Sequence, residues 1–399
     1  MANSGDSSST NHNEDAEVLN GDYDNRFGMG YDSVIETDDA YYFCPFSGTF
    51  LYYFDKDSGV SDVLCGKPEC LHDAGKGEPS CNGNICQIGT SVNLWDGRLH
   101  YYSTDYENRA YALYSISLDG SDRRKDIAIN DSTIMNGLTP QRLDYHRGKL
   151  YGWGYNEIVT DGIPYNSICI FSIDAQTGSF MEVFRQDSLT GLTLPNLYYY
   201  QNFVYISFET LVVDDENQLE QVNWHLLRWN ISTEKIEEVA LIDSDELGYK
   251  AIEYRIYIED DSYIWFAPKS NNMEEPARVY LLENGQCSEA FRFEGTGPCF
   301  LIEDAAISIF IFEKRWEIRR LDGTLIYKGE IDLSFLNALS EDSQFSLESI
   351  SSIMGNSEEV LIAFAVETDD ESGTRICLVR YDMTDEKPVP TLIANVKCN

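Results

Sequence analysis

The chain has 399 residues, 43% of them hydrophobic, and its 68 acidic and 29 basic side chains give a formal net charge of −39. A surface this acidic repels nucleic-acid phosphates and anionic lipid headgroups, which excludes both as partners. No segment approaches the roughly 18 apolar residues of a membrane span, so no span is predicted, whereas cationic ligands, metal ions and neutral glycans stay open.

Residues 1–27 are polar, acidic and low in complexity. Such a segment cannot bury enough apolar surface to fold, so we predict a disordered acidic tether. It has neither the basic n-region nor the apolar h-region of a signal peptide. Tethers of this kind commonly follow the lipidated cysteine of a bacterial lipoprotein. The prediction is therefore an extracellular or cell-surface lipoprotein whose export signal is absent from this chain.

A recurring hairpin organises the remainder. In Leu113–Asp122 an alternating run meets Asp119-Gly120, and a second extended run follows. Alternation is typical of a β-strand, and Asp-Gly tolerates the positive φ of a tight turn. The pattern occurs seven times, roughly 54 residues apart on average, at Asp55, Asp119, Asp174, Asn230, Glu283, Asp322 and Asp382.

Each repeat also has a short first strand and a strongly apolar second strand, such as Phe203–Phe208 or Val360–Val366. Continuous apolar character is typical of strands buried on both faces. Four strands per repeat and seven repeats predict an all-β fold, a seven-bladed β-propeller of four-stranded antiparallel blades over residues 28–399. Because a propeller must close its ring, residues 28–37 are expected beside the last blade.

A Cys-rich insertion, about residues 64–90, separates blades one and two. It contains Cys65, Cys70, His72, Cys81 and Cys86. Three thiolates and an imidazole could form a closed tetrahedral zinc site of the structural kind, which leaves Cys86 unexplained. The four cysteines could instead form two disulfides, which leaves His72 unexplained, or stay unpaired. In each case the predicted role is structural.

Two of these patterns resemble a known group. The phrases Asp96-Gly-Arg-Leu99 and Leu118-Asp-Gly-Ser-Asp122 are similar to those of TolB-like propellers and of uncharacterised propeller lipoproteins from anaerobic Gram-positive bacteria. The insertion also resembles that of the lipoprotein group, in which Leu-Cys, Pro-x-Cys-x-His and Cys-Asn recur. Cys65, Cys70, His72 and Cys81 match this pattern, and Cys86 is extra.

No common catalytic motif occurs: the sequence contains no His-Glu-x-x-His, no Gly-x-Ser-x-Gly and no phosphate-binding loop. Aromatic side chains near strand ends in blades three to five are candidates for gripping a sugar or a peptide, unless they pack between blades; these are Trp153, Tyr155, Tyr199, Trp224 and Trp265.

The favoured function is therefore a monomeric, non-enzymatic recognition scaffold for a glycan or peptide. One alternative is a polysaccharide hydrolase or lyase, in which several carboxylates and an Arg or His converge in an axial pocket. A subunit of an envelope assembly is the other alternative.

Overall fold

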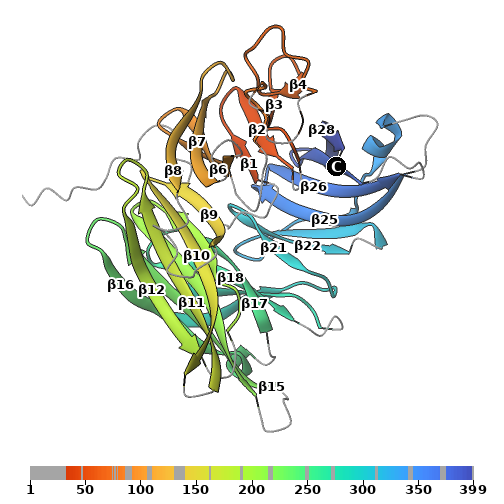
Figure 1. Ribbon diagram of the computed structural model, residues 1–399. Coiled ribbons are helices and arrows are strands. Elements are labelled where there is room, and N and C mark those ends of the chain that lie inside the picture. The colour runs from red at the N-terminus through yellow and green to blue at the C-terminus, as the bar shows by residue number, and fades with distance from the viewer. Residues whose placement is uncertain are drawn as a thin grey trace, which may run out of the picture.

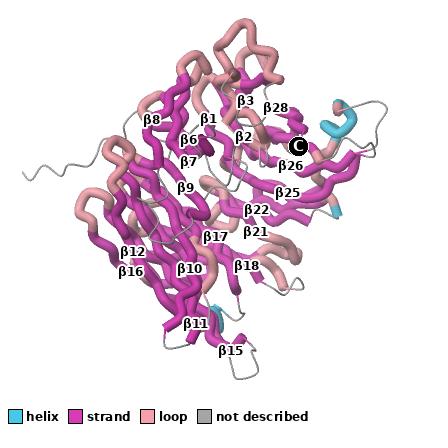
Figure 2. Tube along the Cα trace, viewed as in Figure 1, coloured by secondary structure: helices cyan, strands magenta, loops and turns pink. Residues whose placement is uncertain are grey.

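The computed structural model confirms the seven-bladed propeller (Figure 1). It describes residues 33–45, 48–73, 75, 78, 80–85, 92–105, 110–129, 140–160, 163–188, 192–213, 219–247, 251–270, 275–310, 313–339, 345–368 and 374–397. The predicted tether and Cys86 lie outside these residues. Tyr155 is described for its backbone alone. Almost all regular structure is strand (Figure 2).

Each blade is one antiparallel sheet of four consecutive strands. The first four blades consist, in order, of β1 Ser33–Glu36, β2 Ala40–Cys44, β3 Tyr52–Asp55, β4 Ser61–Val63; β5 Val92–Trp95, β6 Arg98–Asp105, β7 Ala110–Ser117, β8 Arg123–Ile129; β9 Pro140–His146, β10 Lys149–Thr160, β11 Ile163–Asp174, β12 Phe180–Ser188; and β13 Asn196–Tyr200, β14 Phe203–Val213, β15 Leu219–Asn230, β16 Lys235–Asp243.

The last three blades consist of β17 Ala251–Ile258, β18 Tyr263–Ser270, β19 Arg278–Glu283, β20 Gln286–Arg292; β21 Cys299–Leu301, β22 Ala305–Phe310, β23 Arg315–Arg320, β24 Leu325–Glu330; and β25 Phe345–Gly355, β26 Glu359–Thr368, β27 Arg375–Asp382, β28 Val389–Lys397. Two short 3₁₀ helices, η1 Ser244–Leu247 and η3 Ser334–Ala338, lie between blades. No helix in the described parts of the chain is long and apolar enough to cross a membrane.

The repeated hairpin joins the third and fourth strands of every blade, as predicted. In six blades the repeated residue of this hairpin is Asp or Asn, and its side-chain oxygen accepts a backbone N–H group of the turn. In blade five Glu283 accepts the hydroxyl of Tyr263 instead. Oδ1 of Asp174, for example, accepts N–H groups of Gln176 and Thr177 at 3.0 and 2.7 Å. Asn230 does the same with Ser232 and Thr233. The glycine of the Asp119-Gly120 turn has φ +69°.

Seven apolar clusters hold the ring together, one between each pair of neighbouring blades. One of them closes the ring by packing Val34 and Tyr41 of blade one against Ile376 and Ile393 of blade seven. β1 and β2 lie beside β26 and β28 in Figure 1. The expected contact is therefore present, and it involves side chains rather than strand exchange. Both faces of each blade are covered.

Candidate metal centre and surface cleft

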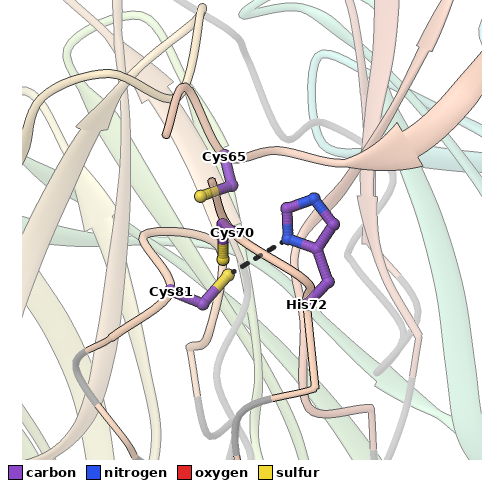
Figure 3. Close-up of side chains that lie close together, drawn as sticks. All are labelled: Cys65, Cys70, His72 and Cys81. Atoms are coloured by element: carbon purple, nitrogen blue, oxygen red, sulfur yellow. Dashed lines mark hydrogen bonds between the residues drawn. The ribbon is translucent and has the colours of Figure 1, made fainter. Parts of the chain in front are cut away.

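Four potential metal ligands of the insertion converge at one point. The sulfurs of Cys65, Cys70 and Cys81 and a ring nitrogen of His72 all lie within 4.8 Å of one another (Figure 3). Sγ of Cys81 lies 3.6 Å from Nδ1 of His72. In a tetrahedral site with bonds of about 2.0–2.3 Å, the ligand atoms lie about 3.5 Å apart. The arrangement therefore fits one zinc ion with a Cys₃His ligand set.

The structure pairs none of the described cysteines in a disulfide. Cys65, Cys70 and Cys81 form no disulfide with one another. The fourth cysteine that the disulfide alternative needs, Cys86, is outside the described residues. The convergence also accounts for His72, which disulfides would leave without a role. Of the two alternatives, the geometry favours the metal site.

A backbone turn and a lysine side chain hold the segments that carry the four candidate ligands. N–H of Cys70 donates to the carbonyl of Lys67 at 3.1 Å, and Nζ of Lys67 donates to the carbonyl of Ser80 at 2.7 Å. His72 lies in the left-handed region with φ 54°, an uncommon conformation for a residue with a side chain. Lys67 therefore ties the segment of Cys65 and Cys70 to the segment of Cys81.

The insertion docks onto the outer hairpin of blade two. N–H of Gly66 and Nδ2 of Asn82 both donate to the carbonyl of Gly120, each at 2.9 Å. A Cβ placed on Gly120 would lie 2.7 Å from the backbone nitrogen of Cys65, so only glycine fits. The sequence indicates the turn at Gly120, but it contains no sign that this turn also receives the insertion.

The thiols have unequal acidities. Burial, the largest influence, acts to raise the pKa of Cys65, but backbone N–H groups of Lys67 and Asn82 and the neighbouring thiols outweigh it, so this pKa lies below 9.0. Burial, followed by the Cys70 thiol, raises the pKa of Cys81 to about 12. A bound zinc ion would hold all three as thiolates, because coordination deprotonates a thiol outright.

Three of the aromatic candidates pack between blades. Trp224 is fully buried, stacks on Tyr254 with ring centroids 4.6 Å apart, and donates its indole N–H to Ser207. Tyr199 and Trp153 are buried in the cluster between blades three and four. These three rings present no exposed face to a ligand in this structure.

Trp265, the remaining aromatic candidate whose side chain the structure describes, lines a cleft. The cleft has a volume of about 680 Å³ and lies between blades five, six and seven. Its acidic and basic side chains come largely from turns after the first strands of these blades; they are Glu259, Glu303, Asp304, Arg320, Asp322 and Glu358. The convergence of these residues could not be predicted from the sequence, because the three groups that contribute them are about 50 residues apart and acidic residues are abundant throughout the chain.

Hydrogen bonds occupy three of these five carboxylates. Glu259 accepts the indole N–H of Trp265 at 2.7 Å, and Asp304 accepts the backbone N–H of Ser357 at 2.6 Å. Asp322 accepts a backbone N–H of its own turn. The carboxylates of Glu303 and Glu358 accept no hydrogen bond from any described residue. They are the carboxylates available to a ligand.

Comparison with known proteins gives similarity at the level of fold. The sequence matches no protein-family model, and no curated protein is similar to it. The propeller domain of the Trilobed protease from Pyrococcus furiosus aligns with 92% of this chain and 98% of its own, at 10% identity and a TM-score of 0.46.

Two further solved structures are similar to a comparable degree. TolB from Acinetobacter baumannii aligns over 90% of this chain and 78% of its own, at 15% identity and a TM-score of 0.34. An acylaminoacyl peptidase from Pyrococcus horikoshii aligns over 90% of this chain, at 9% identity and a TM-score of 0.46, and the chain spans 53% of that protein's length. At these values none of the similarities carries an inference about activity.

Proposed function

We propose that the protein is a non-enzymatic recognition scaffold whose Cys₃His cluster holds one structural zinc ion. Convergence of the four ligands supports the zinc assignment. Since all four positions of a tetrahedral zinc ion would be filled by protein, the ion has no open position for catalysis. In this proposal the acidic tether holds a monomeric propeller at the cell surface as part of a lipoprotein.

Zinc content tests the first half of the proposal. The purified protein is expected to contain close to one zinc ion per chain, and His72→Ala is expected to lose it, because three thiolates alone leave the fourth position open. Elemental analysis measures the stoichiometry. Cys287→Ser, which changes an exposed cysteine outside the cluster, is the matched control and should retain the metal.

The disulfide alternative makes the opposite prediction. Thiol titration of the denatured protein would then count four fewer free groups than the ten cysteines of the chain, and His72→Ala would have almost no effect. That pair of results would exclude the zinc site.

The cleft beside Trp265 supports the second half of the proposal. Its volume falls within the range of typical ligand pockets. It combines an indole with five carboxylates and one cation, Arg320, which pairs with Asp304 at 3.2 Å. An indole face and carboxylates together suit ammonium or guanidinium groups, through cation–π and charge-assisted contacts. A peptide with Lys or Arg side chains is therefore the favoured ligand, and a glycan stacked on Trp265 is the second candidate.

A peptide and glycan array probed with the full chain should reveal the ligand, and Trp265→Ala should weaken its binding by about tenfold or more, since aromatic anchors dominate such sites. Trp95→Ala, which removes a half-buried tryptophan from blade two, is the matched control. Equal losses in both variants would contradict the assignment of the cleft.

The hydrolase or lyase alternative requires several carboxylates and an Arg or His in an axial pocket, and it is kept because the cleft contains this combination of side chains, with Arg320 as the cation. It predicts that Glu303 and Glu358 act as the acid and base. Cleavage of a bound polysaccharide by the native protein but not by Glu303→Gln would favour this alternative over the scaffold.

A further inference from the structure

A second pocket, of about 330 Å³, lies against blade six and contains a buried carboxylate. Glu317 on β23 lines the pocket, and only 2% of its side chain is exposed. Oε1 accepts the Nε–H of Arg319 at 2.6 Å. Oε2 accepts no hydrogen bond of normal geometry in the described part of the chain, although it forms an ion pair with Nζ of Lys328 at 3.4 Å. A buried carboxylate oxygen that has only a long ion pair and no close donor is costly, so a further partner is expected there.

The neighbouring strand presents a second unmet group. Ser308 is the cross-strand partner of Glu317 in the β22–β23 pair, so the two side chains share one face of the blade. Oγ of Ser308 is fully buried and has no hydrogen-bond partner among the described residues. Two adjacent polar groups are thus unsatisfied.

The charges of the pocket change from its base to its rim. Glu317 is buried, Lys328 is 31% exposed and Arg315 is 51% exposed. Lys328 already pairs with both Glu294 and Glu317, whereas Arg315 pairs more loosely with Glu313, at 3.6 Å, and lies opposite Glu330 on β24. The base can therefore accept a donor, and the rim can bind an anion.

Part of the remaining wall is aromatic, and part is polar, with Thr296 and Glu313. Phe310 lies over the Gly295–Gly297 loop, where a Cβ on Gly295 would overlap the ring. A small pocket with an acceptor at its base, a guanidinium at its rim and an aromatic wall suits a small zwitterion with some apolar surface.

We propose that this pocket binds a free amino acid, whose α-ammonium group donates to Oε2 of Glu317 and whose carboxylate pairs with Arg315. The site is separate from the metal centre and from the cleft beside Trp265, and it does not rest on either proposal.

Calorimetric titration of the full chain with each proteinogenic L-amino acid tests the inference. At least one is expected to bind with 1:1 stoichiometry below about 10 mM. For that amino acid, N-acetylation, which removes the ammonium charge, should weaken binding by about tenfold or more. Amidation of the carboxylate should weaken it in the native protein but not in Arg315→Gln.

These ligand comparisons use the native protein, so they hold even if Glu317→Gln does not fold. Where that variant folds, it should lose binding, while Glu367→Gln, an exposed carboxylate on β26, should not. Absence of binding by every amino acid would mean that water alone occupies the pocket and would overturn the inference. Equal affinity for the N-acetylated form would overturn it as well.

Discussion

Gly120→Ala is expected to destabilise the protein far more than Gly97→Ala, although both glycines lie in hairpins of blade two with nearly the same φ, +69° and +68°. An alanine at either position pays about 1–2 kcal/mol for the left-handed conformation. At Gly97 nothing lies within 4 Å of the added Cβ. At Gly120 the added Cβ would lie 2.7–2.9 Å from backbone atoms of residues 64–66, so the insertion must move.

The additional cost at Gly120 is about 2 kcal/mol or more, because the atoms in the way are backbone and cannot rotate aside. Urea unfolding of the two variants measures the difference. Zinc affinity should also fall in Gly120→Ala alone, since the displaced segment carries Cys65. Similar unfolding midpoints for the two variants would show that the insertion does not dock on this hairpin.

The contacts of the insertion also bear on whether the propeller needs it for stability. The sequence predicts that the propeller survives its loss, because each blade buries its own core. In the structure, however, Leu64 and Ile85 at the two ends of the insertion are buried in the cluster between blades one and two. All four strands of blade one are also short, three to five residues long. Its stability therefore depends on its neighbours, and we expect removal of the insertion to affect blade one first.

The sequence was sufficient for the repeat because the repeat is local. Strand alternation and the Asp or Asn of each outer hairpin act within about ten residues, as the hydrogen bonds of Asp174 to its own turn show. The four candidate metal ligands were also identifiable, since Cys65, Cys70, His72 and Cys81 lie within 17 residues. The sequence could not show whether these residues bind zinc or form disulfides, because that depends on where the side chains point.

The ligand sites were less accessible to sequence analysis for a related reason. Alternation shows which side chains share a face of a strand, but in a propeller both faces of every blade are covered by neighbours. Trp224 and Trp265 are therefore equivalent in sequence terms, although one is fully buried and the other lines a cleft. Glu317 and Arg315 belong to an ordinary alternating strand, and only the packing around them shows that Glu317 is buried.

Stability should also depend on pH through Glu209 on β14. This side chain is only 4% exposed, and its carboxylate accepts the hydroxyl of Thr193, which itself accepts the backbone N–H of Glu209 at 2.8 Å. Burial is the main cause that raises the pKa of Glu209 to about 8, and the charge of Glu253 adds to it, while the hydrogen bond from Thr193 acts in the opposite direction. We therefore expect Glu209 to be largely protonated in the folded protein at neutral pH.

Because the pKa of the folded state lies above the ordinary value of 4.5, unfolding releases a proton between pH 4.5 and pH 8. This contribution to stability is complete below pH 4.5 and is lost as the pH rises to about 8. It amounts to roughly 3 kcal/mol between pH 4.5 and pH 7, at about 1.4 kcal/mol per pH unit. Glu209→Gln keeps a neutral side chain that can still accept from Thr193, so it should remove this dependence.

The measurement is the free energy of unfolding in urea at several pH values, taken as the difference between native protein and variant. The difference cancels the many other carboxylates, whose lowered pKa values destabilise the protein in acid instead. Glu209→Gln should gain stability relative to the native protein as the pH rises from 4.5 to 8, whereas the exposed control Glu367→Gln should show a constant difference. A constant difference for Glu209→Gln as well would mean that Glu209 is already ionised at low pH, so that water reaches its carboxylate in the folded protein.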